Sequence, residues 1–431
     1  MALPLLGRAF SFPGPIIGAE ARDIPDDRAD LVIVGAGTVG GWASYFSRTS
    51  GAERVVVIEQ ARVGDGASSR AAGMVRAQGG TPTTVTLGRW SIDFYKRQPA
   101  LLGTDSGFRE LGYLILATTE DEERAARERI AMQREAGLDV RWVDPGEAAR
   151  LDPTLRASSI RGASYAATDG CIDPVRNVRA YSLAMQAVGV ELRERCAFTG
   201  IETSGTTVTA VLTTQGRIET ERVVLTGGPQ LREVGQVIDV PIPAGAVRHQ
   251  VAVTEPHPAF HVDRQAMAFD LGGGLYWRLE DGGLLFGMSN PDETPGPAHS
   301  IDWNYLDAMR RRLARFLPLT DGLELRKAWA ATIDYTPDHL PILGPALTAD
   351  GSIINGITVA SAGGHGMMWG PAVARIAADL ALEGKTTVVD VDQLGLDRFD
   401  AHGHSRLATD PIALPFPTAA VAEAAGDQAR R

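Results

Sequence analysis

The sequence predicts an α/β fold, in which a Rossmann-like nucleotide-binding domain of discontinuous segments is joined to an α+β domain built on an antiparallel sheet. Three observations predict it. A glycine-rich unit of strand, turn, helix and strand begins near residue 30, two further strands that run into glycines lie far from it, and alternating strand patterns fill much of the chain between them. A chain of 431 residues is long enough for two domains.

The first unit is DLVIVGAGTVGGWASYFSRTSGAERVVVIEQ. Gly35, Gly37 and Gly40 have the GxGxxG spacing, which permits a tight turn, the approach of a pyrophosphate and close helix–strand packing. Glu59 ends the second strand, where a carboxylate accepts hydrogen bonds from ribose hydroxyls. The unit predicts a dinucleotide site, with a glycine-rich structural turn as the alternative. The fingerprint does not distinguish FAD from NAD.

Two later segments repeat the pattern of a buried strand followed by glycines. In TERVVLTGGPQ the strand runs into Gly227 and Gly228. In NGITVASAGGHGMMWGPAVARIAADLALEG a strand precedes Gly364 and Gly366, and apolar positions at helical spacing follow over 371–382. A glycine loop at a helix N-terminus offers N–H groups to an electron-rich ligand such as the N1/O2 edge of a reduced flavin. A plain turn is the alternative.

The remaining patterns predict the second domain. FRELGYLILATT, AVRHQVAVTEP, GGLYWRLEDGGLLFGMS and LRKAWAATIDY are typical of strands. Thr119 and Glu122 form a capping box for a charged helix, and Asp173 is expected to cap another helix. The expected boundaries are 28–80, 160–235 and 340–395 for the nucleotide domain, 81–159 and 236–339 for the substrate domain, and 1–27 and 400–431 for terminal extensions.

Composition limits the partners and the compartment. A net charge of −11 argues against nucleic acid, which needs clustered positive charge. No apolar run approaches the roughly 20 residues that span a membrane. Cys171 and Cys196 form neither a CxxC pair nor a disulfide framework, and Arg8 and Pro13 interrupt the apolar N-terminal stretch that a signal peptide needs. We therefore expect a cytoplasmic protein.

Six motifs occur in order: VIVGAGTVG, GDGASSRAAGMVR, DGCIDP, RVVLTGG, YTPDHLPILGP and SAGGHGMM. Together they resemble the FAD-dependent D-amino-acid-oxidase superfamily, in particular the branch of glycine oxidase, sarcosine oxidase and dimethylglycine dehydrogenase, over residues 30–390. The resemblance implies FAD, with ASSRAAGMVR running from the pyrophosphate to the isoalloxazine. The residues expected to contact FAD are Gly35, Gly37, Gly40, Glu59, Gln60, Ser68, Ser69, Arg70, Ala72, Gly73, Met74, Phe198, Gly227, Gly228, Gly364, His365, Gly366 and Met367.

The resemblance also implies how the flavin is held. Arg70 stands where dimethylglycine dehydrogenases often carry a flavin-linking histidine, and Ala331 stands where monomeric sarcosine oxidases carry a flavin-linking cysteine. We therefore expect non-covalent FAD. Arg70 then either places positive charge near the flavin or its phosphates, or forms a surface salt bridge.

Flavin oxidation of an amine removes a hydride equivalent from the carbon next to nitrogen, so the protein must position that carbon and keep the amine neutral. In sarcosine oxidase an arginine matching Arg76 faces the substrate and a histidine matching His365 lies near the amine. Ile333 stands where glycine oxidase has a substrate-binding arginine. The candidate catalytic residues are His365, Arg76, His249, Tyr335, Arg278 and Tyr276.

The resemblance therefore favours an FAD-dependent oxidoreductase that oxidises a small secondary or tertiary amine, with an N-methylated amino acid as the favoured class, by hydride transfer to flavin N5. The alternatives are an amino- or imino-acid oxidase without demethylation, a flavin subunit of a larger redox complex, and a hydroxy-acid oxidase. Leu285 replaces the lysine that helps sarcosine oxidases use oxygen, which favours a dehydrogenase, although O₂ remains a candidate acceptor. The oligomeric state stays open.

Two pairs of histidines are spaced like possible metal ligands, namely His257 with His261 and His402 with His404. Neither pair has a nearby array of cysteines or acids, so we expect no metal.

Overall fold

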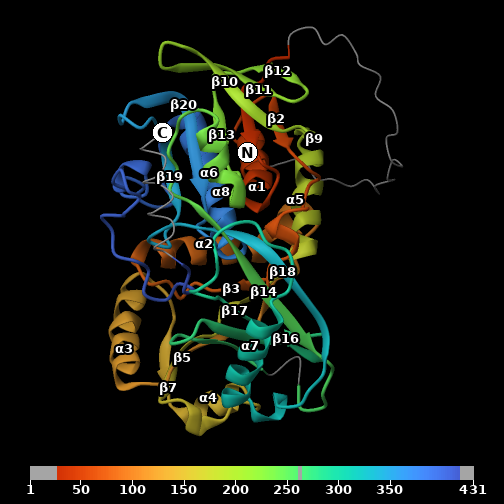
Figure 1. Ribbon diagram of the computed structural model, residues 1–431, viewed down its shortest axis with the longest axis vertical. Helices are drawn as coiled ribbons and strands as arrows, with labels where there is room; N and C mark the ends of the chain where they lie inside the picture. The colour runs from red at the N-terminus through yellow and green to blue at the C-terminus, as the bar shows by residue number, and fades with distance from the viewer. Residues whose placement is uncertain (1–26, 261–264, 418–431) are drawn as a thin grey trace.

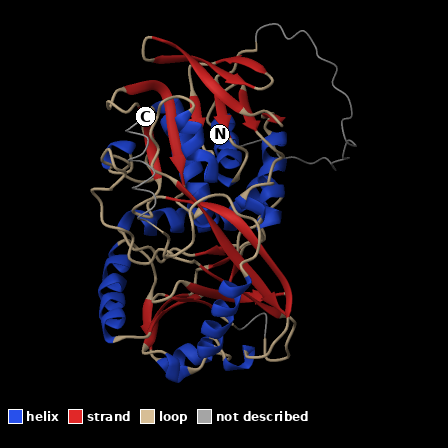
Figure 2. Cartoon of the chain, in the orientation of Figure 1, coloured by secondary structure: helices blue, strands red, loops and turns tan. Residues whose placement is uncertain are grey.

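The computed structural model describes residues 27–260 and 265–417. The chain forms an upper region around a nine-stranded sheet and a lower region around an eight-stranded sheet (Figure 1). Figure 2 shows helices beside both sheets. The predicted α/β class and the two-sheet architecture are confirmed.

The nine-stranded sheet is the nucleotide-binding unit. Strand β1 (Leu31–Val34) lies inside it, with parallel neighbours on both sides. The sheet runs in the order β10 (Phe198–Ser204), β11 (Thr207–Thr213), β20 (Ile353–Ser361), β13 (Val223–Leu225), β1, β2 (Val55–Glu59) and β9 (Glu191–Glu194), with β12 (Gly216–Glu219) paired to β11 and β19 (Ile342–Leu347) paired to β20. Strands from three distant segments therefore end side by side, as the glycine motifs predicted.

Four helices share the largest hydrophobic core with this sheet: α1 (Thr38–Thr49), α2 (Pro82–Leu102), α5 (Pro174–Ala187) and α8 (Gly366–Glu383). Helix α2 was expected in the substrate domain. Its Leu87 and Phe94 join the core formed with α1 and α8, whereas its Val85, Ile92 and Tyr95 join a second cluster outside that core. An amphipathic pattern predicts a buried face but not the core into which that face packs.

The eight-stranded sheet is the central sheet of the lower region. Its order is β18 (Leu325–Tyr335), β14 (Gly245–Thr254), β17 (Gly283–Met288), β16 (Leu275–Glu280), β15 (Met267–Asp270), β5 (Tyr113–Ala117), β7 (Gly162–Ala166) and β6 (Arg141–Val143). Its pairs are antiparallel except β15 with β5. Strand β7 lies in this sheet although residues 160–235 were expected in the nucleotide domain, because it pairs with β5 and β6.

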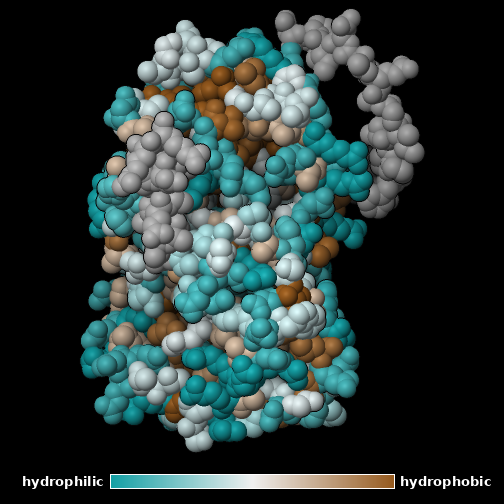
Figure 3. Space-filling view, viewed as in Figure 1, coloured by the Kyte–Doolittle hydropathy of each residue, from teal (hydrophilic) through white to brown (hydrophobic). Residues whose placement is uncertain are grey.

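The other elements pack around the two sheets or connect them. Asp173 caps α5 and Thr119 caps α3 in a capping box, as predicted. Figure 3 shows a mostly hydrophilic face with hydrophobic side chains in separate groups. The remaining elements are α3 (Glu120–Glu135), α4 (Pro145–Leu151), α6 (Leu231–Gln236), α7 (Trp303–Phe316), the small sheet of β3 (Met74–Val75), β8 (Gly170–Cys171) and β4 (Arg109–Glu110), and the 3₁₀ turns η1 (Ala67–Ser69), η2 (Ala157–Ser159), η3 (Gly228–Gln230), η4 (Pro318–Thr320) and η5 (Leu396–Arg398).

Candidate active site

A cavity of about 430 Å³ lies between the two sheets, in the size range of cofactor and small-molecule sites. It extends from the carboxyl ends of β1 and β2 to the lower sheet. The predicted cofactor residues that line it are Gly35, Gly37, Glu59, Gln60, Ser68, Ala72, Gly73, Met74, Phe198, Gly227, Gly228, Gly364, His365, Gly366 and Met367.

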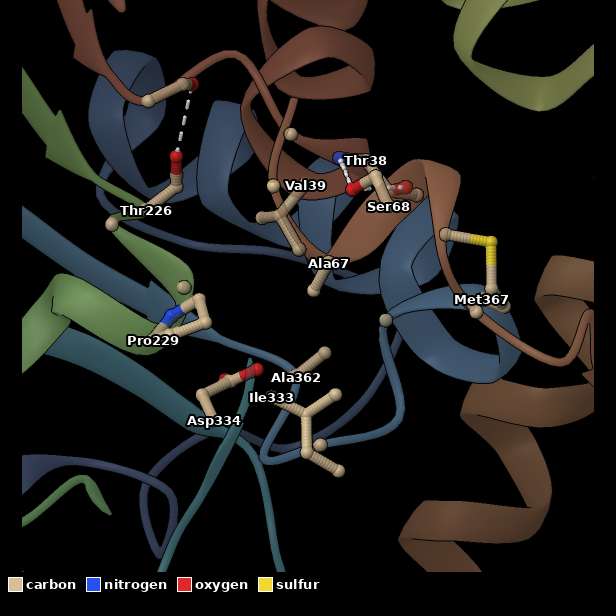
Figure 4. A pocket seen from close by; sticks show the side chains of 18 of the residues that line it. Thr38, Val39, Ala67, Ser68, Thr226, Pro229, Ile333, Asp334, Ala362 and Met367 are labelled. Atoms are coloured by element: carbon tan, nitrogen blue, oxygen red, sulfur yellow. Dashed lines mark hydrogen bonds between the residues drawn. The ribbon is translucent and has the colours of Figure 1, made fainter. Parts of the chain in front are cut away.

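The N-terminus of α1 forms one wall of the cavity. Thr38 donates its backbone N–H to the Ser68 Oγ at 3.0 Å (Figure 4). A Cβ at Gly37 would lie 3.2 Å from that same oxygen, so a larger residue would crowd the Ser68 hydroxyl. Free N–H groups at a helix N-terminus suit a pyrophosphate.

Gly40 does not line the cavity. Its place is between helix and strand, where a Cβ would come within 1.9 Å of the Gly35 carbonyl oxygen. The third glycine of the motif therefore permits close packing of α1 on β1 and does not itself face the ligand space.

Glu59 lies half-buried at the end of β2, on the cavity wall. Its carboxylate accepts backbone N–H groups from Ala36 and Ala61, both at 2.9 Å. These two hydrogen bonds fix the carboxylate, which retains lone pairs for ribose hydroxyls. Together with the open helix N-terminus, this donor and acceptor set fits the nucleotide half of FAD.

The segment from η1 to β3 forms part of the cavity lining. Gly73 has a φ of +74°, and a Cβ there would lie 2.3 Å from the Ile172 carbonyl oxygen, so only glycine lets the segment pass at this point. Arg278 donates from its Nε to the Ala72 carbonyl oxygen at 2.8 Å. Arg278 is not a cavity residue, because its guanidinium lies behind this segment and pairs with Glu280.

Ser69 and Arg70 also lie off the cavity wall. The Arg70 guanidinium turns back to the carbonyl oxygens of Asp65 and Gly66, while its own carbonyl oxygen accepts from the Trp329 indole at 2.8 Å. Arg70 therefore stabilises the loop before η1 by hydrogen bonding to two of its carbonyl oxygens. Among the described residues the guanidinium forms no salt bridge, and the expected placement of positive charge near the flavin or its phosphates stays a prediction.

Arg76 is the buried cation of the lower cavity, with 5% of its surface exposed. Its guanidinium donates to the carbonyl oxygens of Gln78 and Ile412, the latter at 2.7 Å, and lies 5.9 Å from the centre of the Phe269 ring. Among the described residues it forms no ion pair. Carbonyl oxygens orient the guanidinium but leave its charge available to an anion.

His249 and Tyr276 form a hydrogen-bonded pair on the cavity wall. The His249 Nε2 lies 2.6 Å from the Tyr276 hydroxyl oxygen, and Ser289 Oγ lies 3.3 Å from Nδ1. Burial lowers the pKa of His249 to about 4. The same cause raises the pKa of Tyr276 well above its ordinary value, so both groups are neutral near pH 7.

His365 stands at the start of α8 and lines the cavity. Its Nδ1 lies 3.0 Å from the Gly363 carbonyl oxygen, which only accepts, so Nδ1 carries the proton and Nε2 is an acceptor. Burial first, and the charge of Arg76 second, lower the pKa of His365 to about 3. Trp369 stacks on its ring at 4.2 Å.

Tyr335 is fully buried and does not line the cavity. Its ring stacks on Phe416 at 5.3 Å, and its hydroxyl donates to the Pro417 carbonyl oxygen at 3.2 Å. The proposed site role is therefore wrong for its hydroxyl, because a later part of the chain covers this side chain. Sequence patterns give no signal of that cover.

Several cavity residues were not predicted as site residues. Tyr113 and Phe269 reach the cavity from neighbouring strands β5 and β15, which are buried at every position and so show no polar–apolar alternation that would mark the cavity side. Asp334 lines it beside Ile333 (Figure 4), accepts from Ser361 Oγ at 2.8 Å, and has a pKa raised by burial. Leu414 had no sequence signal at all.

Within the described ranges, no cluster of three or more histidine, cysteine or acidic side chains is arranged to hold a metal ion. His261 lies outside those ranges. No helix of residues 27–260 or 265–417 is long and apolar enough to cross a membrane.

Curated relatives share this chain's sequence at low identity. The 4-methylaminobutanoate oxidase (formaldehyde-forming) of Paenarthrobacter nicotinovorans is 26% identical over 401 residues, covering 90% of this chain and 48% of the relative. The glycine oxidase of Geobacillus kaustophilus is 28% identical over 383 residues, covering 86% of this chain and 97% of the relative. The chain spans about half the length of the first of these relatives.

Solved structures and a family model agree with these relatives. The L-proline dehydrogenase from P. horikoshii superposes with a TM-score of 0.79 at 25% identity, over 86% of this chain and 97% of that one. The G. kaustophilus glycine oxidase gives 0.75 at 26% identity, over 87% and 100%. A family model described as FAD dependent oxidoreductase matches residues 30–380. The chain therefore belongs to the DAO family of FAD-dependent oxidoreductases, and FAD is its cofactor.

Proposed function

We propose that this protein oxidises the C–N bond of a small secondary or tertiary amine that carries a carboxylate, with N-methylated amino acids as the substrate class. The observation that carries the proposal is Arg76, a buried cation that forms no ion pair among the described residues and lines the same cavity as two neutral histidines. A carboxylate and an amine on one small molecule would match these groups.

Arg76 binds the carboxylate in this proposal. The hydrogen bonds to the Gln78 and Ile412 carbonyl oxygens hold the guanidinium in place before substrate arrives. Charge-assisted hydrogen bonds between a guanidinium and a carboxylate are strong and directional. Binding the carboxylate fixes one end of the substrate and so limits where its amine can lie.

The two histidines keep the amine neutral. The His365 Nε2 is an unprotonated acceptor at the cavity and can accept an N–H hydrogen bond from the substrate. The pair of His249 and Tyr276 is buried and uncharged, and a buried site that also contains the Arg76 cation favours the neutral form of a bound amine. A neutral amine is required because its lone pair must stabilise the carbon that loses hydride.

FAD, when bound, accepts the hydride equivalent from the carbon next to nitrogen. The side chains of Tyr113, Phe269 and Tyr276 form an apolar wall that keeps water away from that carbon. We propose that the FAD is held without a covalent bond, because Arg70 faces away from the cavity and Ala331 offers no nucleophile.

Product analysis tests the proposal. The purified holoprotein is mixed with N-methylated amino acids and a dye acceptor, and both formaldehyde and the demethylated amino acid are measured. Equal amounts of the two products support the proposal, with N-methylated amines that lack a carboxylate as the control. Turnover that yields ammonia or a cyclic imine without formaldehyde would instead indicate an amino- or imino-acid oxidase.

A further inference from the structure

Residues that follow the family match are built into the substrate cavity. The match ends at residue 380, yet the chain from η5 onwards returns to the junction of the two sheets. Asp338 of the YTPD motif anchors it. The Asp338 carboxylate accepts from Arg398 Nε at 2.7 Å and from Ser405 Oγ at 2.6 Å, and the ion pair with Arg398 is fully buried.

A second anchor places the residues that follow, 410–417, which we call the C-terminal wall. The buried Asp410 carboxylate accepts from the Ile412 N–H at 2.9 Å and from Thr84 Oγ1 at 3.2 Å, so it joins the wall to the start of α2. Phe416 then stacks on Tyr335 at 5.3 Å and on His339 at 5.4 Å. Contacts at both ends therefore define the path of the chain between them.

Between these anchors the wall touches the cavity twice. The Ile412 carbonyl oxygen accepts from Arg76 Nη2 at 2.7 Å. The half-buried Leu414 side chain lines the cavity and packs against two hydrophobic clusters, one that contains Phe269 and Tyr276 and one that includes Ile333. These three side chains also line the cavity. Phe269 lies 5.9 Å from the Arg76 guanidinium, so Leu414 packs in the cluster that adjoins the cation.

We propose that the C-terminal wall determines substrate specificity, because Leu414 limits the length of the carbon chain attached to the carboxylate that Arg76 binds. The Ile412 carbonyl oxygen accepts from Arg76, and the Leu414 side chain two residues later occupies cavity space beside Phe269 and Tyr276. This inference rests on the proposed function in one respect, namely that Arg76 binds a carboxylate.

The size of the effect follows from the volume that Leu414 occupies. Leu414→Ala removes three carbon atoms from the cavity side of the wall and would open room for a longer ligand chain. Each methylene that becomes buried would tighten binding by about 0.8 kcal/mol, or about fourfold in Kd. Leu414→Phe adds bulk at the same place and should weaken the binding of longer chains relative to shorter ones.

The experiment uses holoprotein and unbranched monocarboxylates from acetate to pentanoate, whose binding is measured by the change in FAD absorbance without turnover. We expect Leu414→Ala to lower the ratio of the pentanoate Kd to the acetate Kd by at least about fourfold. Leu414→Phe should raise the same ratio. Leu407→Ala is the matched control, because Leu407 lies in the same part of the chain and does not line the cavity.

Three results would overturn the inference: an unchanged ratio in both Leu414 variants, an equal shift in Leu407→Ala, or no monocarboxylate binding by the wild-type holoprotein. FAD content and melting temperature are measured for every variant, and Leu414→Val replaces any variant that loses FAD. If the dependence of Kd on carboxylate chain length shifts but no amine reduces the flavin, the role of the C-terminal wall is supported and the proposed function is wrong. If amines are oxidised but this dependence does not change, the proposed function holds and the wall does not set specificity.

Discussion

Arg76→Met is the substitution that most directly removes the proposed substrate anchor. Methionine has a similar length and an apolar end, so it fills much of the space of a side chain that is 5% exposed. The variant loses the charge and leaves the carbonyl oxygens of Gln78 and Ile412 without their donor. Both consequences can be measured separately.

The loss of substrate binding follows from burial. Removing one partner of a buried, hydrogen-bonded charge pair costs about 2–4 kcal/mol, which is a rise in substrate Kd of about 30-fold to 900-fold. The FAD end of the cavity is unchanged, so FAD content should stay at the wild-type level. The two carbonyl oxygens that lose their donor should lower the unfolding free energy by about 1–3 kcal/mol each if water does not replace it.

Anaerobic stopped-flow reduction measures this effect, because the dependence of the flavin reduction rate on substrate concentration separates Kd from the limiting rate. Arg76→Lys keeps a positive charge but not the planar fork, and it should recover part of the affinity. Arg124→Met, on the solvent side of α3 with 67% of its side chain exposed, controls for a general change in charge. A wild-type Kd for substrate in Arg76→Met, with FAD bound, would refute the role of Arg76.

Three further outcomes are expected. Acid precipitation should release FAD into the supernatant, because Arg70 and Ala331 provide no covalent attachment; flavin that stays with the denatured protein would contradict this. Because burial holds the pKa of His249 at about 4, the unfolded chain binds a proton below its ordinary pKa of 6.5 while the folded chain does not, so stability falls as pH drops from 6.5 to 4. At about 1.4 kcal/mol per pH unit, His249→Gln should lose about 3 kcal/mol less than wild type over that window in urea unfolding, and equal losses would exclude His249 as a contributor. Reduced enzyme should react with oxygen more slowly than with a dye, because Leu285 is a buried strand residue where a lysine would supply charge; reoxidation by oxygen as fast as turnover would mean an oxidase.

The nucleotide half of the site was predictable because its physical requirements are local. A tight turn, a helix N-terminus and an acid at a strand end each demand particular residues at fixed spacing, as Gly35, Gly37 and Glu59 show. Helix caps are equally local, and Asp173 caps α5 as its position before Pro174 predicted.

The substrate half depends on contacts between distant segments, which spacing does not reveal. Arg278 was a reasonable candidate on a strand, but its side chain lies behind Ala72 and away from the cavity. Tyr335 is covered by Phe416, and Leu414 completes the cavity from a segment that follows the family match. Nothing in the local pattern around Leu414 distinguishes it from a residue of a surface extension.

Anaerobic titration of the holoprotein with a panel of small substrates tests the central claim most directly, with flavin bleaching as the signal. The panel contains N-methylated amino acids, the same amines without a carboxylate, primary amino acids and 2-hydroxy acids. The proposed function predicts bleaching by N-methylated amino acids and a large loss of that bleaching when the carboxylate is absent. Bleaching by 2-hydroxy acids alone, or equal bleaching by amines with and without a carboxylate, would contradict it.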